Sequence, residues 1–293
     1  MNSNPLWDAA AVEQAVSRVA TMRPAYSSLI GFYGAVFVAQ AQAAGKTSPA
    51  EILLDDALLE MKAKEGFSLV EPAAFTVDTP AAEKLLSQIC EIAVRSGEKL
   101  GAAGAALNRA MGDGVAMDGL FADVLADKGR IAEFAGSMDV SPQMISLLFY
   151  LAVKPSLEAG ARQLAARLTD SQENRSSCPV CGSAPIIGEL DAEGQQWIHC
   201  GLCWHRWPVK RLACPFCHNR DSSSLEYLYS EDEPEYRVNL CGGCRRYLKV
   251  ADTRKMGRGF YPPLEQVASL HLDMLAVEKG YGHAVASTIP GAV

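Results

Sequence analysis

Apolar residues before position 170 recur at helical spacing, most clearly in the segment after Thr79. The apolar residues of that segment would share one face of a helix, namely Leu85, Leu86, Ile89, Cys90 and Ala93. The surrounding sequence is rich in Ala, Leu, Glu, Gln and Met, as is typical of packed helices. We therefore predict about six to eight helices in this part of the chain. Cys90 is predicted to lie in the core, because an unpaired cysteine commonly behaves as a small buried hydrophobe.

Three short motifs indicate where helices begin, since each pairs a capping residue with a proline. In the first, Ser48-Pro49-Ala50-Glu51, the glutamate can complete a capping box, and the motif predicts a helix over Ile52–Met61. The other two motifs, Thr79-Pro80 and Ser141-Pro142, precede apolar runs at Leu85–Val94 and Met144–Val153. The glycine-rich stretch Gly97–Gly119 is typical of a loose connection or of closely packed short helices.

The helical pattern ends at a polar stretch, Ser171–Ser177. Beyond it the chain is rich in turns and cysteines, and three runs have the residue types of β-strands: Gln195–His199, Leu225–Tyr229 and Tyr236–Leu240. After Pro262-Pro263, the apolar residues from Leu264 to Leu275 fit one closing amphipathic helix. We therefore predict an α+β protein with a mainly helical domain (1–172), two small four-cysteine metal modules (173–210 and 211–255), and a C-terminal helix and tail (256–293).

Eight of the nine cysteines stand in four Cys-x-x-Cys turns, here called knuckles, within 67 residues. The first residues lack the basic and apolar regions of a secretory signal, and no stretch approaches the roughly 18 apolar residues of a membrane span. We therefore expect a cytoplasmic protein without membrane insertion, where such pairs indicate metal binding rather than disulfides. A Cys-Gly-x-Cys knuckle also resembles the redox motif of thioredoxin-like proteins, but the βαβ context of that motif is not evident here.

The spacing of the knuckles predicts how they combine. The gap is 18 residues between the first two knuckles and 23 between the last two, enough for a β-hairpin in each case, while only 10 separate the second knuckle from the third. We therefore predict two tetrahedral sites with sequential pairing. A cross-braced arrangement, first with third and second with fourth, is the alternative. The predicted metal ligands are Cys178, Cys181, Cys200 and Cys203 in the first site, and Cys214, Cys217, Cys241 and Cys244 in the second.

Four thiolates favour zinc or iron, and spacing alone does not choose between them. A structural zinc can contribute roughly 10 kcal/mol or more to folding, so modules this small should collapse without metal. Because cysteine fills all four tetrahedral positions, no position stays open for a substrate. The sequence has no P-loop, GxGxxG or GxSxG motif, so we predict no catalytic residues, no nucleotide cofactor and no enzymatic activity.

Other polar and aromatic residues lie beside the knuckles. Three histidines, His199, His205 and His218, are expected to orient loops or to lie at the surface, because the cysteines already complete two sites. The run Trp204–Trp207 contains Trp, His and Arg directly after the second knuckle. It can be interpreted as an exposed patch that holds a partner, or as aromatic cover that shields the metal from water.

The charge balance argues against a nucleic-acid binder. The formal net charge is −7, and residues 175–255 contain 11 lysines and arginines against 10 aspartates and glutamates. Phosphate binding usually requires a clear positive excess. The small basic cluster of Arg245, Arg246 and Lys249 does not reverse this balance, so we expect no nucleic-acid partner.

The order of these motifs resembles the formate dehydrogenase accessory protein family, FdhE. The resemblance covers residues 175–283 and rests on four stretches: CPVCGSAP, CGLCWHRWPVKRLACPFC, YRVNLCGGCRRYLKV and LEQVASLHLDMLAVEKGY. The most family-like stretch runs from Cys241 to Lys249. The helical half is similar only in general character, which includes the motif Lys154-Pro155-Ser156-Leu157.

The resemblance implies a cytoplasmic protein whose two modules are rubredoxin-like and bind iron, one ion each, with zinc as a possible substitute. It further implies a maturation factor, or chaperone, that acts on the molybdenum-containing catalytic subunit of formate dehydrogenase before export and is required for its activity. The eight knuckle cysteines would be the metal ligands. Two other classes remain as alternatives, a rubredoxin-type electron carrier and a zinc-ribbon nucleic-acid binder.

Overall fold

The structure, a computed structural model, describes residues 7–126, 129–168 and 174–283. The chain divides into two compact units. One contains residues 6–52 and 72–160 and is helical, and the other contains residues 53–71 and 161–286 and is built around a β-sheet. The predicted α+β class is confirmed, with a helical N-terminal region, a mixed sheet, two four-cysteine clusters and C-terminal helices.

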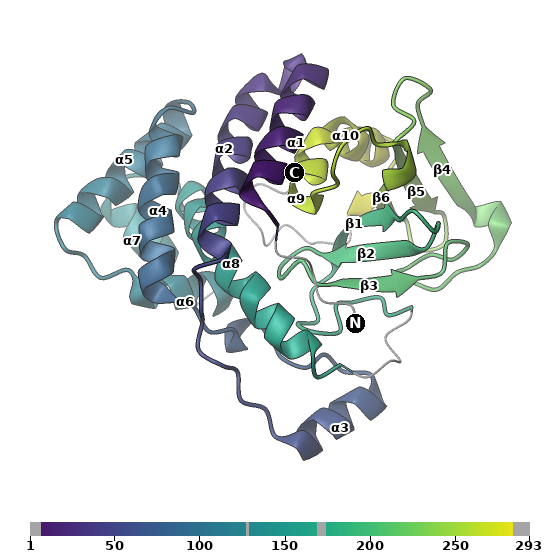
Figure 1. Cartoon of the computed structure of the whole chain (residues 1–293), viewed down its shortest axis with the longest axis horizontal. Helices are drawn as coiled ribbons and strands as arrows, with labels where there is room; N and C mark the ends of the chain where they lie inside the picture. The colour runs from purple at the N-terminus through teal and green to yellow at the C-terminus, as the bar shows by residue number, and fades with distance from the viewer. Residues whose placement is uncertain (1–6, 127–128, 169–173, 284–293) are drawn as a thin grey trace. The chain divides into compact units, whose positions relative to one another are not determined.

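Eight α-helices occur among the described residues before position 169, as predicted (Figure 1). They are α1 (Ala9–Met22), α2 (Ser27–Ala44), α3 (Asp56–Glu65), α4 (Thr79–Val94), α5 (Glu98–Gly112), α6 (Asp118–Ala126), α7 (Arg130–Ser137) and α8 (Pro142–Ala165). All except α3 and the last turn of α8 lie in the helical unit.

Two of the three predicted helix starts are confirmed, at α4 and α8, although the residue that caps α4 is Asp78 and not Thr79. The prediction of a helix over Ile52–Met61 is wrong, because α3 begins only at Asp56. The side chain of Asp55 accepts a hydrogen bond from the Leu58 amide at 3.0 Å and caps α3 there. The Ser48 amide donates instead to the side chain of Asp78, the cap of α4, at 2.8 Å.

The glycine-rich stretch Gly97–Gly119 contains α5, so closely packed helix is the correct alternative. Gly104 of α5 lies against the backbone of α4, where an added Cβ would stand 2.7 Å from the Cys90 carbonyl oxygen. Only glycine permits this approach. Cys90 is fully buried, as predicted, and burial raises the pKa of its thiol to about 12.

Helix α8 forms the core of the helical unit in spite of Pro155 in its interior. With 24 residues it is long and apolar enough to cross a membrane, contrary to the expectation that no stretch would qualify. However, 83% of its apolar window is buried inside the fold, the pattern of a core helix. Lys154 is also buried there and pairs with Glu158 at 3.1 Å.

The second unit contains one seven-stranded sheet in the order β3-β2-β1-β6-β5-β4, with β7 paired to β6. Hairpins join β1 to β2 and β4 to β5, while a parallel pairing of β1 with β6 joins the two halves. The strands β2 (Gln196–Cys200), β4 (Leu225–Tyr229) and β5 (Tyr236–Cys241) occur where they were predicted. The remaining strands are β1 (Pro185–Leu190), β3 (Arg206–Val209), β6 (Arg246–Asp252) and β7 (Gly282–His283).

The predicted closing helix is divided into α9 (Pro262–Ala268) and α10 (Leu270–Glu278). The break falls at Ser269, whose hydroxyl donates to the Glu265 carbonyl at 2.6 Å. The Ser269 carbonyl accepts from the buried Lys249 ammonium of β6 at 3.4 Å. A side chain of the sheet thus bonds to the backbone at the break, which the apolar periodicity alone did not reveal.

Candidate metal centres

The four knuckles share one backbone design. The carbonyl of the first cysteine accepts from the amide four residues later in three of them, at 2.8–2.9 Å, with donors Gly182, His218 and Arg245. The residue after the second cysteine has a positive φ in all four: 76° at Gly182, 58° at Trp204, 58° at His218 and 57° at Arg245. Glycine suits this conformation best, and the other three residues adopt it at a steric cost.

The knuckles are brought together in sequential pairs by the two hairpins. Cys178 and Cys181 precede β1, and Cys200 and Cys203 lie at and after the end of β2. In the second cluster Cys214 and Cys217 precede β4, while Cys241 ends β5 and Cys244 follows it. Within each cluster the four sulfur atoms lie within 4.8 Å of one another. The structure therefore assembles the two predicted groups of four, and not the cross-braced alternative.

The distances between sulfur atoms fit a tetrahedral metal ion. They are 3.7, 3.4 and 3.5 Å for the pairs 178–203, 181–200 and 181–203, and 3.7 Å for the pairs 214–244 and 217–241. Thiolates about 2.3 Å from a central ion would stand about 3.8 Å apart. A disulfide would require about 2.05 Å, so these groups have the spacing of metal ligands.

The two clusters differ in their access to solvent. All four cysteines of the first site are buried. In the second site Cys217 is exposed and Cys244 is partly exposed. Two sites with identical ligands therefore have different surroundings.

A distant segment of the chain covers the first site. Leu69 and Val70 are both buried, and their amides donate to the carbonyls of Pro179 and Val180 at 3.0 Å. These carbonyls lie inside the first knuckle. The segment comes from more than a hundred residues earlier, so the knuckle sequences contain no signal for it.

Burial also controls the ionisation of the cysteines. Burial raises the pKa of the Cys178 and Cys203 thiols well above the ordinary value. Buried thiolates are therefore unfavourable unless a cation compensates their charge, which couples deprotonation to metal binding.

The aromatic run after the second knuckle is not an exposed patch. Trp204, His205 and Trp207 are all buried, and Trp204 packs with Ile186 and Ile187. The indole of Trp207 donates to the Arg175 carbonyl at 2.9 Å. The exposed-patch interpretation is therefore wrong, and the burial of both tryptophans supports the alternative of aromatic cover.

The histidines stand outside both clusters. Of those beside the knuckles, only His218 is exposed. His199 lies 2.9 Å from the carboxylate of Glu189, and burial lowers the pKa of His205 to about 4. Glu189 also accepts from Arg206, at 3.4 Å.

Buried polar contacts, which no sequence motif indicates, attach the C-terminal helices to the sheet. Lys249 of β6 donates to Asp273 of α10 at 2.6 Å, and Tyr247 donates to the same carboxylate at 2.9 Å. Arg258, in the loop before α9, pairs with Glu265 at 2.5 Å, and the hydroxyl of Tyr236 of β5 donates to the same carboxylate. Lys249 lies in the most family-like stretch, from Cys241 to Lys249. Its contacts hold α10 against the sheet.

Known proteins resemble this chain in sequence and in fold. Residues 177–211 match the family model described as "FdhE, central domain". A "Protein FdhE homolog" of Aquifex aeolicus is 36% identical over 108 residues, or 36% of this chain and 38% of that protein. One of Haemophilus ducreyi is 35% identical over 147 residues, or 48% and 47%. The matched part thus spans less than half the length of these relatives.

The fold likeness extends over the whole chain. The crystal structure of the FdhE protein from Pseudomonas aeruginosa has a TM-score of 0.68 and 20% sequence identity, and the match covers 98% of this chain and 97% of that one. The family model and the sequence relatives thus show that residues around the first site are similar to FdhE proteins, and the solved structure shows that the chain shares the fold of one of them.

Proposed function

We propose that this chain is a maturation factor for formate dehydrogenase, which acts on the catalytic subunit and binds one iron ion in each four-cysteine cluster. The observation that carries this proposal is the pair of clusters with tetrahedral sulfur spacing, in a chain whose relatives are FdhE homologues. Because four thiolates fill the coordination sphere, each ion would stabilise the fold rather than activate a substrate.

The eight cysteines would hold the ions, with Zn²⁺ as a substitute for iron. Protein purified from its native host without oxygen should contain about two iron ions per chain, one for each cluster. Oxidised iron protein should show the colour of thiolate-to-iron charge transfer, and a zinc form should be colourless and folded. Metal analysis by mass spectrometry checks the identity of the ion. Nitrogen or oxygen ligands in X-ray absorption spectra would contradict the all-sulfur sites.

The function is tested in a strain that lacks this protein. Formate dehydrogenase polypeptide should be present but inactive, because a maturation factor acts on its client rather than on formate. Cys178→Ser and Cys217→Ser should fail to restore activity. Cys90→Ala should restore it, because Cys90 lies in the core of the helical unit and in neither cluster. Normal formate dehydrogenase activity per polypeptide in the deletion strain would contradict the proposal.

A rubredoxin-type electron carrier is the second candidate, and the exposure of Cys217 favours it. An exposed ligand shortens the path for electrons to a partner. The carrier role predicts reversible one-electron reduction of the iron protein, together with normal dehydrogenase activity per polypeptide when the protein is absent. The same deletion strain therefore separates the two candidates.

A further inference from the structure

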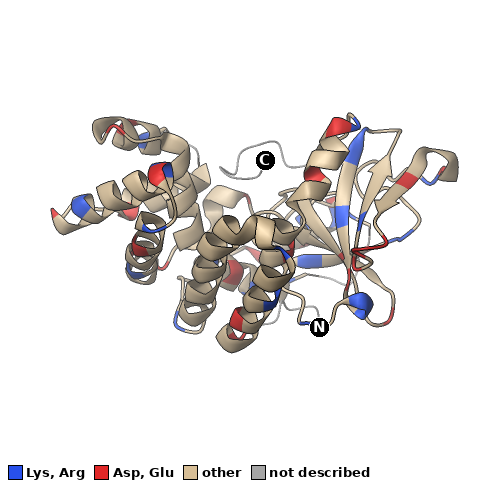
Figure 2. Ribbon diagram, turned by 90° about the horizontal axis from the view of Figure 1, so that it is seen from above, with Lys and Arg blue, Asp and Glu red and all other residues tan. Residues whose placement is uncertain are grey.

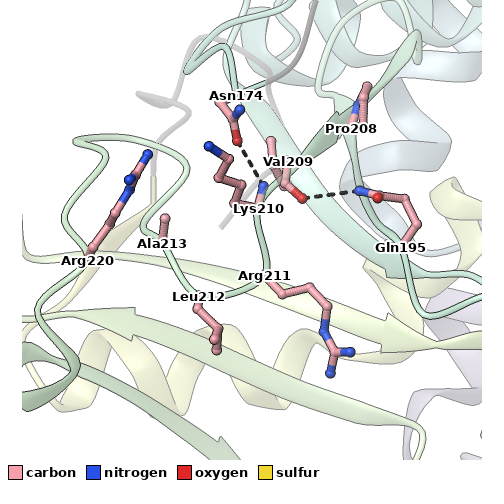
Figure 3. Close-up of a pocket in the computed structure, with 9 residues that line it drawn as sticks. All are labelled: Asn174, Gln195, Pro208, Val209, Lys210, Arg211, Leu212, Ala213 and Arg220. Atoms are coloured by element: carbon pink, nitrogen blue, oxygen red, sulfur yellow. Dashed lines mark hydrogen bonds between the residues drawn. The ribbon is translucent and has the colours of Figure 1, made fainter.

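The linker between the two clusters forms a basic pocket of 480 Å³. Its charged lining consists of Lys210, Arg211 and Arg220, and no carboxylate of a described residue lines it. Leu212 and Ala213 also line the pocket (Figure 3). Cys214 of the second site follows them directly in the chain. Figure 3 shows the side chains of Lys210 and Arg220 reaching toward the same part of the pocket, whereas Arg211 extends the other way.

These three cations are available for a ligand. All three side chains are exposed. Among the described residues no carboxylate forms an ion pair with any of them, although other arginines of the unit, such as Arg254 and Arg258, have acidic partners. In a chain with a net charge of −7, unpaired cations gathered at one pocket favour an anionic ligand. Figure 2 shows that basic and acidic residues are otherwise interspersed over this unit.

A second pocket, of 550 Å³, adjoins the basic pocket through Arg211, which lines both. It contains Tyr227 and Tyr229 of β4, each 64% exposed, with ring centroids 6.0 Å apart. We call this the tyrosine pocket. Leu212, which lines the basic pocket and follows Arg211 in the chain, is 86% exposed. Exposed tyrosine and arginine are the residues most enriched where protein partners bind.

Strand β4 adds backbone groups to this surface. It is an edge strand, paired only with β5 among the described strands. An edge strand can hydrogen-bond to an extended peptide, and its exposed side chains then select the sequence of that peptide. The tyrosine pocket has mixed charge, with Glu231 and Glu235 beside its arginines, so the acidic part of such a ligand belongs in the basic pocket.

We propose that the basic pocket and the tyrosine pocket together bind an extended acidic segment of a protein partner. Carboxylates of that segment pair with Lys210 and Arg220, and its neighbouring apolar residues contact Leu212 and the two tyrosines. This inference rests on the proposed function, for which it supplies the client-binding surface. The surface lies beside the exposed second site, because Arg220 is three residues beyond Cys217.

The test compares two charge reversals of equal size. The double variant Lys210→Glu/Arg220→Glu changes the pocket, and Lys64→Glu/Lys279→Glu changes two exposed lysines of α3 and of the residue after α10. Binding of purified formate dehydrogenase catalytic subunit is measured by biolayer interferometry at several salt concentrations. We expect the pocket variant to lose affinity by about tenfold or more, with a weaker salt dependence, and the control to bind like wild type.

The outcomes keep the two proposals apart. If wild-type protein does not bind the catalytic subunit, the proposed function fails. If wild type binds and the pocket variant binds equally well, the function stands and the surface assignment is overturned. Retained metal in the pocket variant, two ions per chain as in wild type, shows that lost binding does not come from unfolding of a cluster.

A second measurement identifies the ligand chemistry without the client. Fluorescein-labelled hexaglutamate should bind wild type and not the pocket variant, by fluorescence anisotropy. Inorganic phosphate at the same total charge should displace it only weakly, because a free ion lacks the linked carboxylates that pair with Lys210 and Arg220 at the same time. Equal displacement by phosphate would show that the basic pocket is a site for small anions and not for a peptide. Dimers in light scattering that are lost in the pocket variant would make a second copy of this chain the occupant.

Discussion

One backbone conformation recurs after the second cysteine of every knuckle, although the side chain at that position differs each time. Only Gly182 carries a residue type that favours this conformation, since Trp, His and Arg give no such signal. An L-residue in the left-handed region costs roughly 1–2 kcal/mol, and glycine avoids that cost. The conformation is therefore imposed by the turn that directs both sulfurs to one point. At the residue scale the ligands were predictable, and the strain beside them was not.

His218 provides the sharpest test of this strain, because its side chain is exposed and its φ is 58°. His218→Gly and His218→Ala both remove the imidazole, but only glycine adopts the left-handed region freely. We expect the glycine variant to be more stable than the alanine variant by about 1 kcal/mol. Urea unfolding of the metal-loaded proteins gives this difference. Equal stability of the two variants would show that the turn imposes no strain.

The buried pair Lys249–Asp273 allows a second test at this scale. Lys249→Met leaves the Asp273 carboxylate buried without its cation, which should cost about 3–5 kcal/mol of unfolding free energy. Lys249→Met/Asp273→Asn removes that uncompensated charge and retains an acceptor for Tyr247, so it should recover most of the loss. Denaturant unfolding measures both. A double variant no more stable than the single one would contradict this account.

At the scale of elements, short-range signals predicted the number of helices in the first part of the chain, two of the helix starts and three strands. Helix α3 begins four residues later than predicted because Ser48 bonds to the cap of α4 and Asp55 caps α3. The C-terminal helix is divided where Lys249 reaches the Ser269 carbonyl. The Ser48–Asp78 and Lys249–Ser269 contacts each join residues at least 20 positions apart, which apolar periodicity does not encode.

The cover over the first site predicts the order of metal loss. With a chelator in excess, the exposed second site should release its ion in a fast phase and the buried first site in a slow phase. Cys217→Ser should remove the fast phase. Leu69→Ala/Val70→Ala thins the cover of the first knuckle, so the slow phase should accelerate. Release is followed by the absorbance of a metal indicator, and a single phase in wild type would contradict the difference in access.

At the scale of the whole sheet, the sequence indicated two modules separated by a ten-residue linker, and the structure shows their strands in one sheet. The connection is the parallel pairing of β1 with β6, in the register Gly188 to Val250. Gly188 allows this contact, because an added Cβ would stand 3.0 Å from the Val250 side chain. Parallel pairs between segments sixty residues apart give no local signal. Composition along the chain therefore could not reveal that this pairing joins the two predicted modules in one sheet.

This pairing predicts that the two metal clusters are coupled through the sheet. Cys178→Ser should empty the first site and loosen β1, which pairs with residues 250–252 of β6. Amide hydrogen exchange of residues 248–252 should therefore accelerate, even though the second cluster keeps its four cysteines. Gly188→Val should have the same effect without any change of a ligand, since its side chain would clash with Val250.

If exchange in β6 stays at the wild-type rate in both variants, the clusters fold as independent modules, and a partner could engage the second without the first. Accelerated exchange would mean that metal in the buried site also supports β4, through β6 and β5, and with β4 the surface proposed to hold the acidic segment.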